Sequence, residues 1–206
     1  MANQISFQQE IWRKLNHLLI ATLPISYIFL SKFLLMCFIA PICITIIAVD
    51  FGRHKNEKIA QIFNRFFSKI LRDHEKDKLC GAAYFSFAAL IIFGFFPKVI
   101  AINAFLILAI CDSLAAIIGR SMQTQPFFEK SLGGSLAFLI SGLVVIALVG
   151  VIFKQDVLYY LFAVIAVAVT TIIEARPSLL NLDDNLTIPF AFSLTLLAFN
   201  TIWIYN

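Results

Sequence analysis

The sequence predicts an all-α, polytopic integral membrane protein with about seven transmembrane helices and one amphipathic helix at the cytoplasmic membrane surface. Two observations carry this prediction. Of the 206 residues, 61% are hydrophobic and only 14% are charged. Apolar runs of about 18 residues or more also recur, and each is long enough to cross about 30 Å of hydrocarbon. Residues 1–206 are therefore expected to form a single membrane domain with no appended soluble domain.

The predicted spans follow one another closely along the chain. Basic residues precede the first apolar run, but no small-residue cleavage site is evident, so this run is expected to remain as the first helix. The first two spans are short and could pack as a helical hairpin. In chain order, the predicted spans cover residues 15–31, 33–49, 79–96, 99–119, 133–153, 157–175 and 187–204.

Residues 54–78 differ from these spans because apolar and basic side chains occupy different faces of one expected helix. The pattern is typical of an amphipathic helix that lies in the lipid headgroup layer. A solvated connecting helix is the alternative. The apolar positions are Ile59, Ile62, Phe63, Phe66, Phe67, Ile70 and Leu71, and the basic positions are Lys58, Arg65, Lys69, Arg72 and Lys76.

The distribution of charge predicts the orientation of the chain. With seven spans, thirteen of the sixteen Lys and Arg residues fall on one side of the membrane, and only Lys32, Lys98 and Lys154 fall on the other. The positive-inside rule assigns the basic side to the cytoplasm, with the N-terminus inside and the C-terminus on the opposite side. Eleven of the twelve acidic residues share the basic side. We expect this orientation in a cell inner membrane or an endomembrane.

Asp112 lies inside an apolar run long enough to form a helix. This run is followed by Gly119, Arg120 and the loop Lys130–Ser135. A carboxylate inside a membrane costs about 2.5–3.5 kcal/mol on insertion scales and needs a partner or a cavity. Arg120 and Lys130 could neutralise phosphate, and Gly133-Gly134 before the next helix would allow close backbone approach to an anion. Pairing of the carboxylate with an arginine, and a simple helix start, are the structural alternatives.

The segment Arg176–Pro189 contains a second group of acidic residues. Asp112 with Asp183 or Asp184 would supply the one or two carboxylates that Mg²⁺ typically takes, besides substrate phosphates. Asp183, Asp184 and Asn185 could also bind the ion through water. The alternative is a turn and a helix N-cap, for which Asp and Asn are well suited.

These motifs resemble the CTP-dependent lipid kinase family, which includes dolichol kinase, phytol kinase and the fungal type of diacylglycerol kinase. The resemblance spans nearly the whole chain. Cys111 stands where the family usually has Gly, and Gly133 where it usually has Glu. The matching residues are Arg13-Lys14 with His17; Asp50 and Arg53; Arg72, Glu75 and Leu79–Ala82; Asp112–Ala116 with Gly119-Arg120; Lys130-Ser131 with Gly134-Ser135; and Glu174 with Asp184–Pro189.

The resemblance implies phosphoryl transfer from CTP, with Mg²⁺, to the hydroxyl of a membrane lipid alcohol such as a polyprenol, a phytol-like alcohol or diacylglycerol. The implied catalytic residues are Asp112, Lys130 and Asp184; as an alternative to a metal role, Asp112 would be the base for the lipid hydroxyl. The implied nucleotide-binding residues are Arg13, Lys14, Gly119, Arg120, Lys130, Ser131, Gly133, Gly134 and Ser135. The implied metal-binding residues are Asp112, Asp183, Asp184 and Asn185.

Two other functions remain open at this point. A phosphatidate cytidylyltransferase also uses CTP and has a similar motif in mid-chain, but it would make CDP-lipid and pyrophosphate. A small non-catalytic transporter would instead carry charges along a path from one face to the other. No nucleic-acid partner is expected, and the sequence leaves the lipid acceptor, the choice of CTP or ATP and the oligomeric state open.

Overall fold

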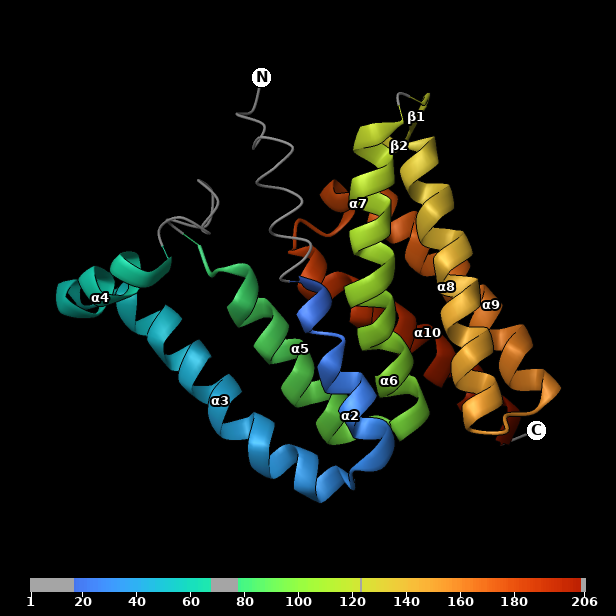
Figure 1. The fold of residues 1–206 in the computed structure, drawn as a ribbon, viewed down its shortest axis with the longest axis horizontal. Helices are drawn as coiled ribbons and strands as arrows, with labels where there is room; N and C mark the ends of the chain where they lie inside the picture. Colours follow the sequence, from blue (N-terminus) through green and yellow to red (C-terminus); the bar gives the residue numbers. More distant parts are fainter. Residues whose placement is uncertain (1–16, 68–77, 123, 205–206) are drawn as a thin grey trace.

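The computed structural model describes residues 17–67, 78–122 and 124–204, which form a bundle of helices with one short β-hairpin (Figure 1). The predicted all-α class is confirmed, since the hairpin strands contain two residues each. The elements are α2 (Thr22–Phe29), α3 (Lys32–Arg53), α4 (Glu57–Phe67), α5 (Gly81–Phe95), α6 (Lys98–Leu106), the π turn η2 (Ile107–Cys111), α7 (Asp112–Ser121), β1 (Pro126–Phe127), β2 (Lys130–Ser131), α8 (Leu132–Ile152), α9 (Val157–Ala175), the 3-10 turn η3 (Pro177–Leu179) and α10 (Asp184–Ile204).

Among the described residues, four helical stretches are long and apolar enough to cross a membrane. They are α3, α8, α9 and the continuous stretch Lys98–Ser121 formed by α6, η2 and α7. The apolar helices His17–Phe29, α5 and Asp184–Phe199 are shorter. The 15 residues of α5, for example, extend about 22 Å, less than the hydrocarbon thickness of about 30 Å. All seven predicted segments are helical, but the prediction of seven crossings is not supported.

The helices run alternately in opposite directions (Figure 1). The stretch Lys98–Ser121 lies at the centre, where Ala101, Phe105 and Leu108 are fully buried. The ring of Phe105 stacks on Phe93 of α5, with 4.6 Å between the ring centroids. We call the end of the bundle that carries β1 and β2 the hairpin end. The last turns of α7 and α9 and the first turn of α8 meet there (Figure 1).

The predicted amphipathic segment 54–78 contains α4, while its residues 68–77 lie outside the described part of the chain. Of the predicted apolar positions in α4, Phe63 is buried and Ile62 is exposed, so the apolar residues do not all pack against the bundle. Phe63 lies under the guanidinium of Arg53, 4.7 Å from the ring centroid. This contact fixes α4 to the end of α3.

A buried ion pair joins the end of α3 to the start of α5. Arg53 Nε donates to Asp50 Oδ1 at 2.6 Å, and the other carboxylate oxygen of Asp50 accepts the backbone N–H of Cys80 at 2.9 Å. Arg53 also donates to the carbonyl of Lys78 at 2.7 Å. Because Cys80 is the N-cap residue of α5, Asp50 satisfies a backbone donor that this helix start would leave unpaired. Asp50 and Arg53 therefore have a structural role.

We predict that Asp50→Ala destabilises the protein by roughly 3 kcal/mol, because the substitution leaves a buried guanidinium without its carboxylate. Thermal unfolding in detergent micelles would measure the change. Glu57→Ala is the control, since Glu57 is an exposed acidic residue in the first turn of α4 and should change stability by less than about 0.5 kcal/mol. Equal melting temperatures for the two variants would contradict the structural role of Asp50.

Candidate functional site

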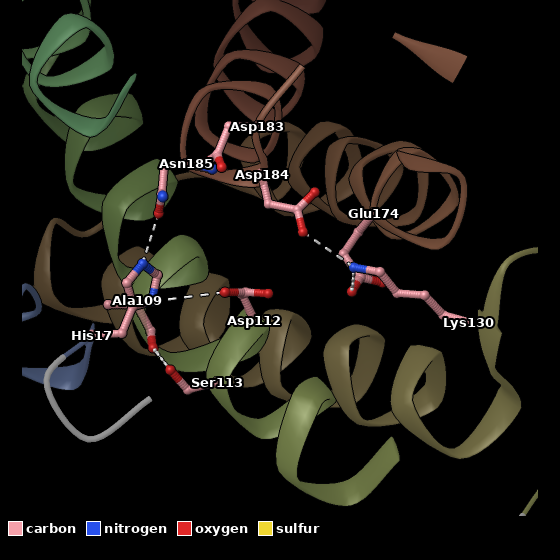
Figure 2. Close-up of polar contacts among 9 residues, drawn as sticks. All are labelled: His17, Ala109, Asp112, Ser113, Lys130, Glu174, Asp183, Asp184 and Asn185. Atoms are coloured by element: carbon pink, nitrogen blue, oxygen red, sulfur yellow. Dashed lines mark hydrogen bonds and ion pairs between the residues drawn. The ribbon is translucent and has the colours of Figure 1, made fainter. Parts of the chain in front are cut away.

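The hairpin places one lysine over the end of α9. Glu129, in the hairpin turn, donates its backbone N–H to the carbonyl of Ala175 at 3.1 Å and accepts the hydroxyl of Ser178 with its side chain. These contacts hold β2 beside the last turn of α9. Lys130 of β2 then donates to the Glu174 carboxylate and, at 3.4 Å, to Oδ2 of Asp184 at the start of α10 (Figure 2).

Asp112 approaches the same place from the central helix. Asp112 is only 5% exposed and is the first residue of α7, immediately after the π turn η2. Figure 2 shows one carboxylate oxygen directed at His17 and the other toward the side of Lys130 and Glu174. His17 Nδ1 lies 3.7 Å from Asp112 Oδ2, and His17 Nε2 lies 2.8 Å from Asn185 Oδ1. The site therefore collects residues from segments that are distant in the sequence.

The electrostatics of the site leave Lys130 as a permanent cation. Burial acts to lower the pKa of Lys130, but the negative charges of Asp184, Glu174 and Asp112 outweigh burial and raise its pKa above the usual range. The pKa of Lys130 is higher in the folded protein than in the unfolded chain. The attraction between Lys130 and these carboxylates therefore stabilises the fold fully at neutral pH, and this stabilisation is lost only as the pH rises through the raised pKa. Lys130 is thus protonated throughout the physiological range.

The donors at the site are the kind that Mg²⁺ prefers. Asp112, Glu174 and Asp184 offer carboxylate oxygens around one ammonium, and the buried Oε2 of Glu174 has no hydrogen-bond partner within the described part of the chain. In that part, no group of three or more His, Cys, Asp or Glu side chains is placed to hold a metal ion. Mg²⁺ commonly takes only one or two carboxylates and completes its shell with phosphate and water, so its binding here stays a prediction.

The two neighbouring aspartates of the acidic segment have different environments. Asp183 Oδ1 accepts the backbone N–H of Asn185 at 2.9 Å, and its carbonyl accepts Leu186 and Thr187 at 2.9 and 3.0 Å. Asp183 therefore caps the start of α10, as the structural alternative expects. Figure 2 shows Asp183 turned away from Lys130 and Asp184 turned toward it. A metal role for Asp183 stays a prediction.

Gly119 and Gly134 allow α7 and α8 to pack closely. A Cβ atom at Gly134 would lie 2.9 Å from the carbonyl oxygen of Ala115 and 3.2 Å from the Cα of Gly119. A Cβ atom at Gly119 would lie 2.7 Å from Ser131 Oγ, which itself donates to the Gly119 carbonyl. The space that these glycines leave free is occupied by protein, so their visible role is helix packing.

The backbone donors at the start of α8 already have protein partners. The N–H groups of Leu132, Gly133 and Gly134 donate to the Gln125 carbonyl, to Thr124 Oγ1 and to Ser131 Oγ, at 2.9, 2.8 and 3.2 Å. Ser131 is thus the N-cap residue of α8. Phosphate binding by this loop stays a prediction, and it would require these donors to change partners. The ammonium group of Lys130 likewise already has protein partners, the carboxylates of Glu174 and Asp184.

The remaining predicted residues are less central. Arg120 is exposed in the last turn of α7, about 12 Å along the helix axis from Asp112. Ser135 is buried in the first turn of α8, and its Oγ has no hydrogen-bond partner among the described residues. Arg13 and Lys14 lie outside the described residues. Cys111 is fully buried within the π turn and belongs to the hydrophobic core.

Two residues of the site received no role from the sequence. Glu174 ends an apolar helix in which it is the single charged residue, and that isolation was a usable signal. His17 is one of the residues that resemble the lipid kinase family, but a lone histidine before an apolar run indicates no role by itself. Its contact with Asn185 joins residues 168 positions apart. Only the fold brings His17 and Asn185 together.

No family model matches the sequence, and no solved structure matches it significantly. An uncharacterised protein of Rickettsia prowazekii is 29% identical over 192 residues, which cover 92% of this chain and 94% of that protein. An uncharacterised protein of Methanocaldococcus jannaschii is 27% identical over 88% of this chain and 90% of its own length. The CTP-dependent diacylglycerol kinase 1 of Schizosaccharomyces pombe is 30% identical over 86 residues, which are 40% of this chain and 39% of that enzyme.

We predict that Gly134→Ala destabilises the contact between α7 and α8 by about 1–3 kcal/mol, because the new methyl group meets backbone atoms that cannot move aside. Gly94→Ala is the matched control. A Cβ atom at Gly94 has its nearest neighbour, Met36 Cε, at an ordinary 3.7 Å, so this variant should be neutral or slightly more stable. Melting temperatures in detergent would compare them. A Gly134→Ala variant as stable as Gly94→Ala would contradict the packing role.

Proposed function

We propose that the protein transfers the γ-phosphoryl group of a nucleoside triphosphate, CTP by resemblance, to the hydroxyl of a membrane lipid alcohol. The observation that carries this proposal is the meeting of Asp112, Lys130, Glu174 and Asp184 at one end of an apolar bundle. Ionised groups are costly in such surroundings, and groups retained there commonly serve a function. The partial similarity to a CTP-dependent diacylglycerol kinase supports the same activity.

In this proposal, the protein supplies positioning and charge neutralisation, which dominate phosphoryl transfer. Lys130 binds the phosphates. The Asp112 carboxylate accepts the proton of the lipid hydroxyl, whose oxygen forms a bond to the γ-phosphorus. The bond between the γ-phosphorus and its bridging oxygen breaks, and CDP leaves with the electron pair. The products are a lipid phosphate and CDP.

A divalent ion would bind Asp184 and, where Asp112 is a ligand instead of the base, Asp112 as well; Glu174 is the further carboxylate beside Lys130. Bound Mg²⁺ would supply positive charge to the triphosphate. Lys130 faces the carboxylates of Asp184, Glu174 and Asp112. A bound Mg²⁺ ion would add positive charge beside these carboxylates.

The hairpin end faces the cytoplasm in this proposal, where soluble nucleotides occur. The basic residues favour this orientation by the positive-inside rule, and with it a cytoplasmic N-terminus and a C-terminus on the opposite side. The exposed Ile62 of α4 would dip into the headgroup layer, where the lipid hydroxyl lies. Toward the hairpin end the described basic residues are Arg53, Lys55, Lys58, Arg65, Lys78, Arg120, Lys130 and Arg176, whereas Lys32, Lys98 and Lys154 lie at the opposite end.

We predict that purified protein in lipid vesicles transfers label from γ-labelled CTP to a lipid alcohol, and that label in the cytidine ring stays in water-soluble CDP. A panel of polyprenol, phytol and diacylglycerol, each assayed with CTP and with ATP, would identify the acceptor and the donor. Cytidine label in the lipid fraction would instead indicate a phosphatidate cytidylyltransferase. Absence of both, together with solute flux across the vesicles, would indicate a transporter.

We predict different effects for the same substitution at adjacent positions. Asp184→Asn removes a negative charge beside Lys130 and should lower kcat by about 10²-fold or more. Asp183→Asn should keep activity within about threefold, because Asn caps a helix as well as Asp does. Both variants should reach normal abundance in the membrane. Equal losses of kcat in the two variants would contradict the different roles of Asp183 and Asp184. Such a result would support the metal role that the sequence predicts for Asp183.

A further inference from the structure

His17 lies between two parts of the candidate site that otherwise come from opposite ends of the sequence. It opens the apolar helix His17–Phe29, and its side chain is 14% exposed. On one side, Nε2 lies 2.8 Å from the side-chain oxygen of Asn185 in the first turn of α10. On the other side, Nδ1 lies 3.7 Å from Oδ2 of Asp112 (Figure 2).

The contact with Asn185 fixes the imidazole ring. The amide atom of Asn185 that faces His17 is the oxygen, Oδ1. An amide oxygen only accepts hydrogen bonds, so Nε2 of His17 is the donor. The ring is then held in one orientation, with Nδ1 3.7 Å from Asp112 Oδ2, a distance too long for a hydrogen bond. The side-chain oxygen of Asn185 is engaged by this contact, which gives Asn185 a role different from the metal role that the sequence predicts.

The position of His17 restricts Asp112. The ring occupies the space next to Oδ2 of Asp112, and the other oxygen faces the side of Lys130 and Glu174 (Figure 2). Asp112 is buried, and its negative charge acts on Lys130. A fixed neighbour on one side of a carboxylate limits its rotation, which keeps the second oxygen directed into the site.

We infer that His17 is a positioning residue for the phosphoryl transfer: held by Asn185, it orients the Asp112 carboxylate toward the reacting groups. The inference rests on the proposed function and adds a residue to it. Since His17 acts through Asp112, its loss lowers kcat and leaves the binding of nucleotide nearly unchanged. A merely structural tie between His17–Phe29 and α10 would instead lower the amount of folded protein.

The test compares His17 variants with the wild type by kcat and by KM for CTP, per amount of folded, monodisperse protein. His17→Phe keeps the ring volume but loses both nitrogens, and should lower kcat about 10–100-fold with KM for CTP within about threefold. His54→Phe is the matched control, because His54 is exposed at the end of α3 and should leave kcat unchanged.

Two amide variants separate the two contacts. Asn at position 17 places a nitrogen near the site of Nδ1, on the Asp112 side, whereas Gln extends a nitrogen toward the site of Nε2 and Asn185. His17→Asn should therefore recover more of kcat than His17→Gln. The reverse order would overturn the role through Asp112, as would a His17→Phe variant with the kcat of the wild type. A wild-type protein without phosphoryl transfer would overturn the proposed function first, and this inference with it.

Discussion

The ion pair between Lys130 and Glu174 is the interaction on which the hairpin end of the molecule depends. Glu174 is nearly inaccessible to solvent at the end of an apolar helix, where an ionised carboxylate is tolerated only beside a cation. Lys130 belongs to a hairpin strand of two residues, and its neighbour Ser131 caps α8. Because Lys130 also contacts Asp184 at the start of α10, one ammonium group links α8, α9 and α10.

The same ammonium group serves stability and, in the proposed function, substrate binding. Its raised pKa keeps the charge available to both. Removal of Lys130 would therefore disturb fold and activity together, whereas Asp184 can be changed with less structural effect because its side chain is 30% exposed. The buried pair Asp50–Arg53, in contrast, joins α3 to α5 and has a structural role.

Periodicity and composition were sufficient to predict every apolar helix, with boundaries close to those observed, but not how many of them cross a membrane. Length decides that question, and α5 is too short by itself. The hairpin was not predictable, because its two-residue turn places Phe128 at φ 55° where such turns usually have Gly, Asn or Asp. Asp184 contacts Lys130, and the charge of Asp112 acts on Lys130, but the predicted roles of these residues stay predictions. The packing role of Gly119 and Gly134 depends on which helix faces which, and this is a property of the fold.

The π turn η2 has a consequence for how this sequence can vary. A π turn contains one residue more than an α-helical turn, and each residue rotates a helix by about 100°. The extra residue therefore rotates α7 relative to α6. This rotation determines the direction of the Asp112 side chain relative to the buried face of α6. Loss of one residue between Ile107 and Cys111 would leave a continuous apolar helix of unchanged character, yet turn Asp112 away from Lys130. In the segment Ile107–Cys111, the direction of Asp112 therefore depends more on the number of residues than on which apolar residues they are.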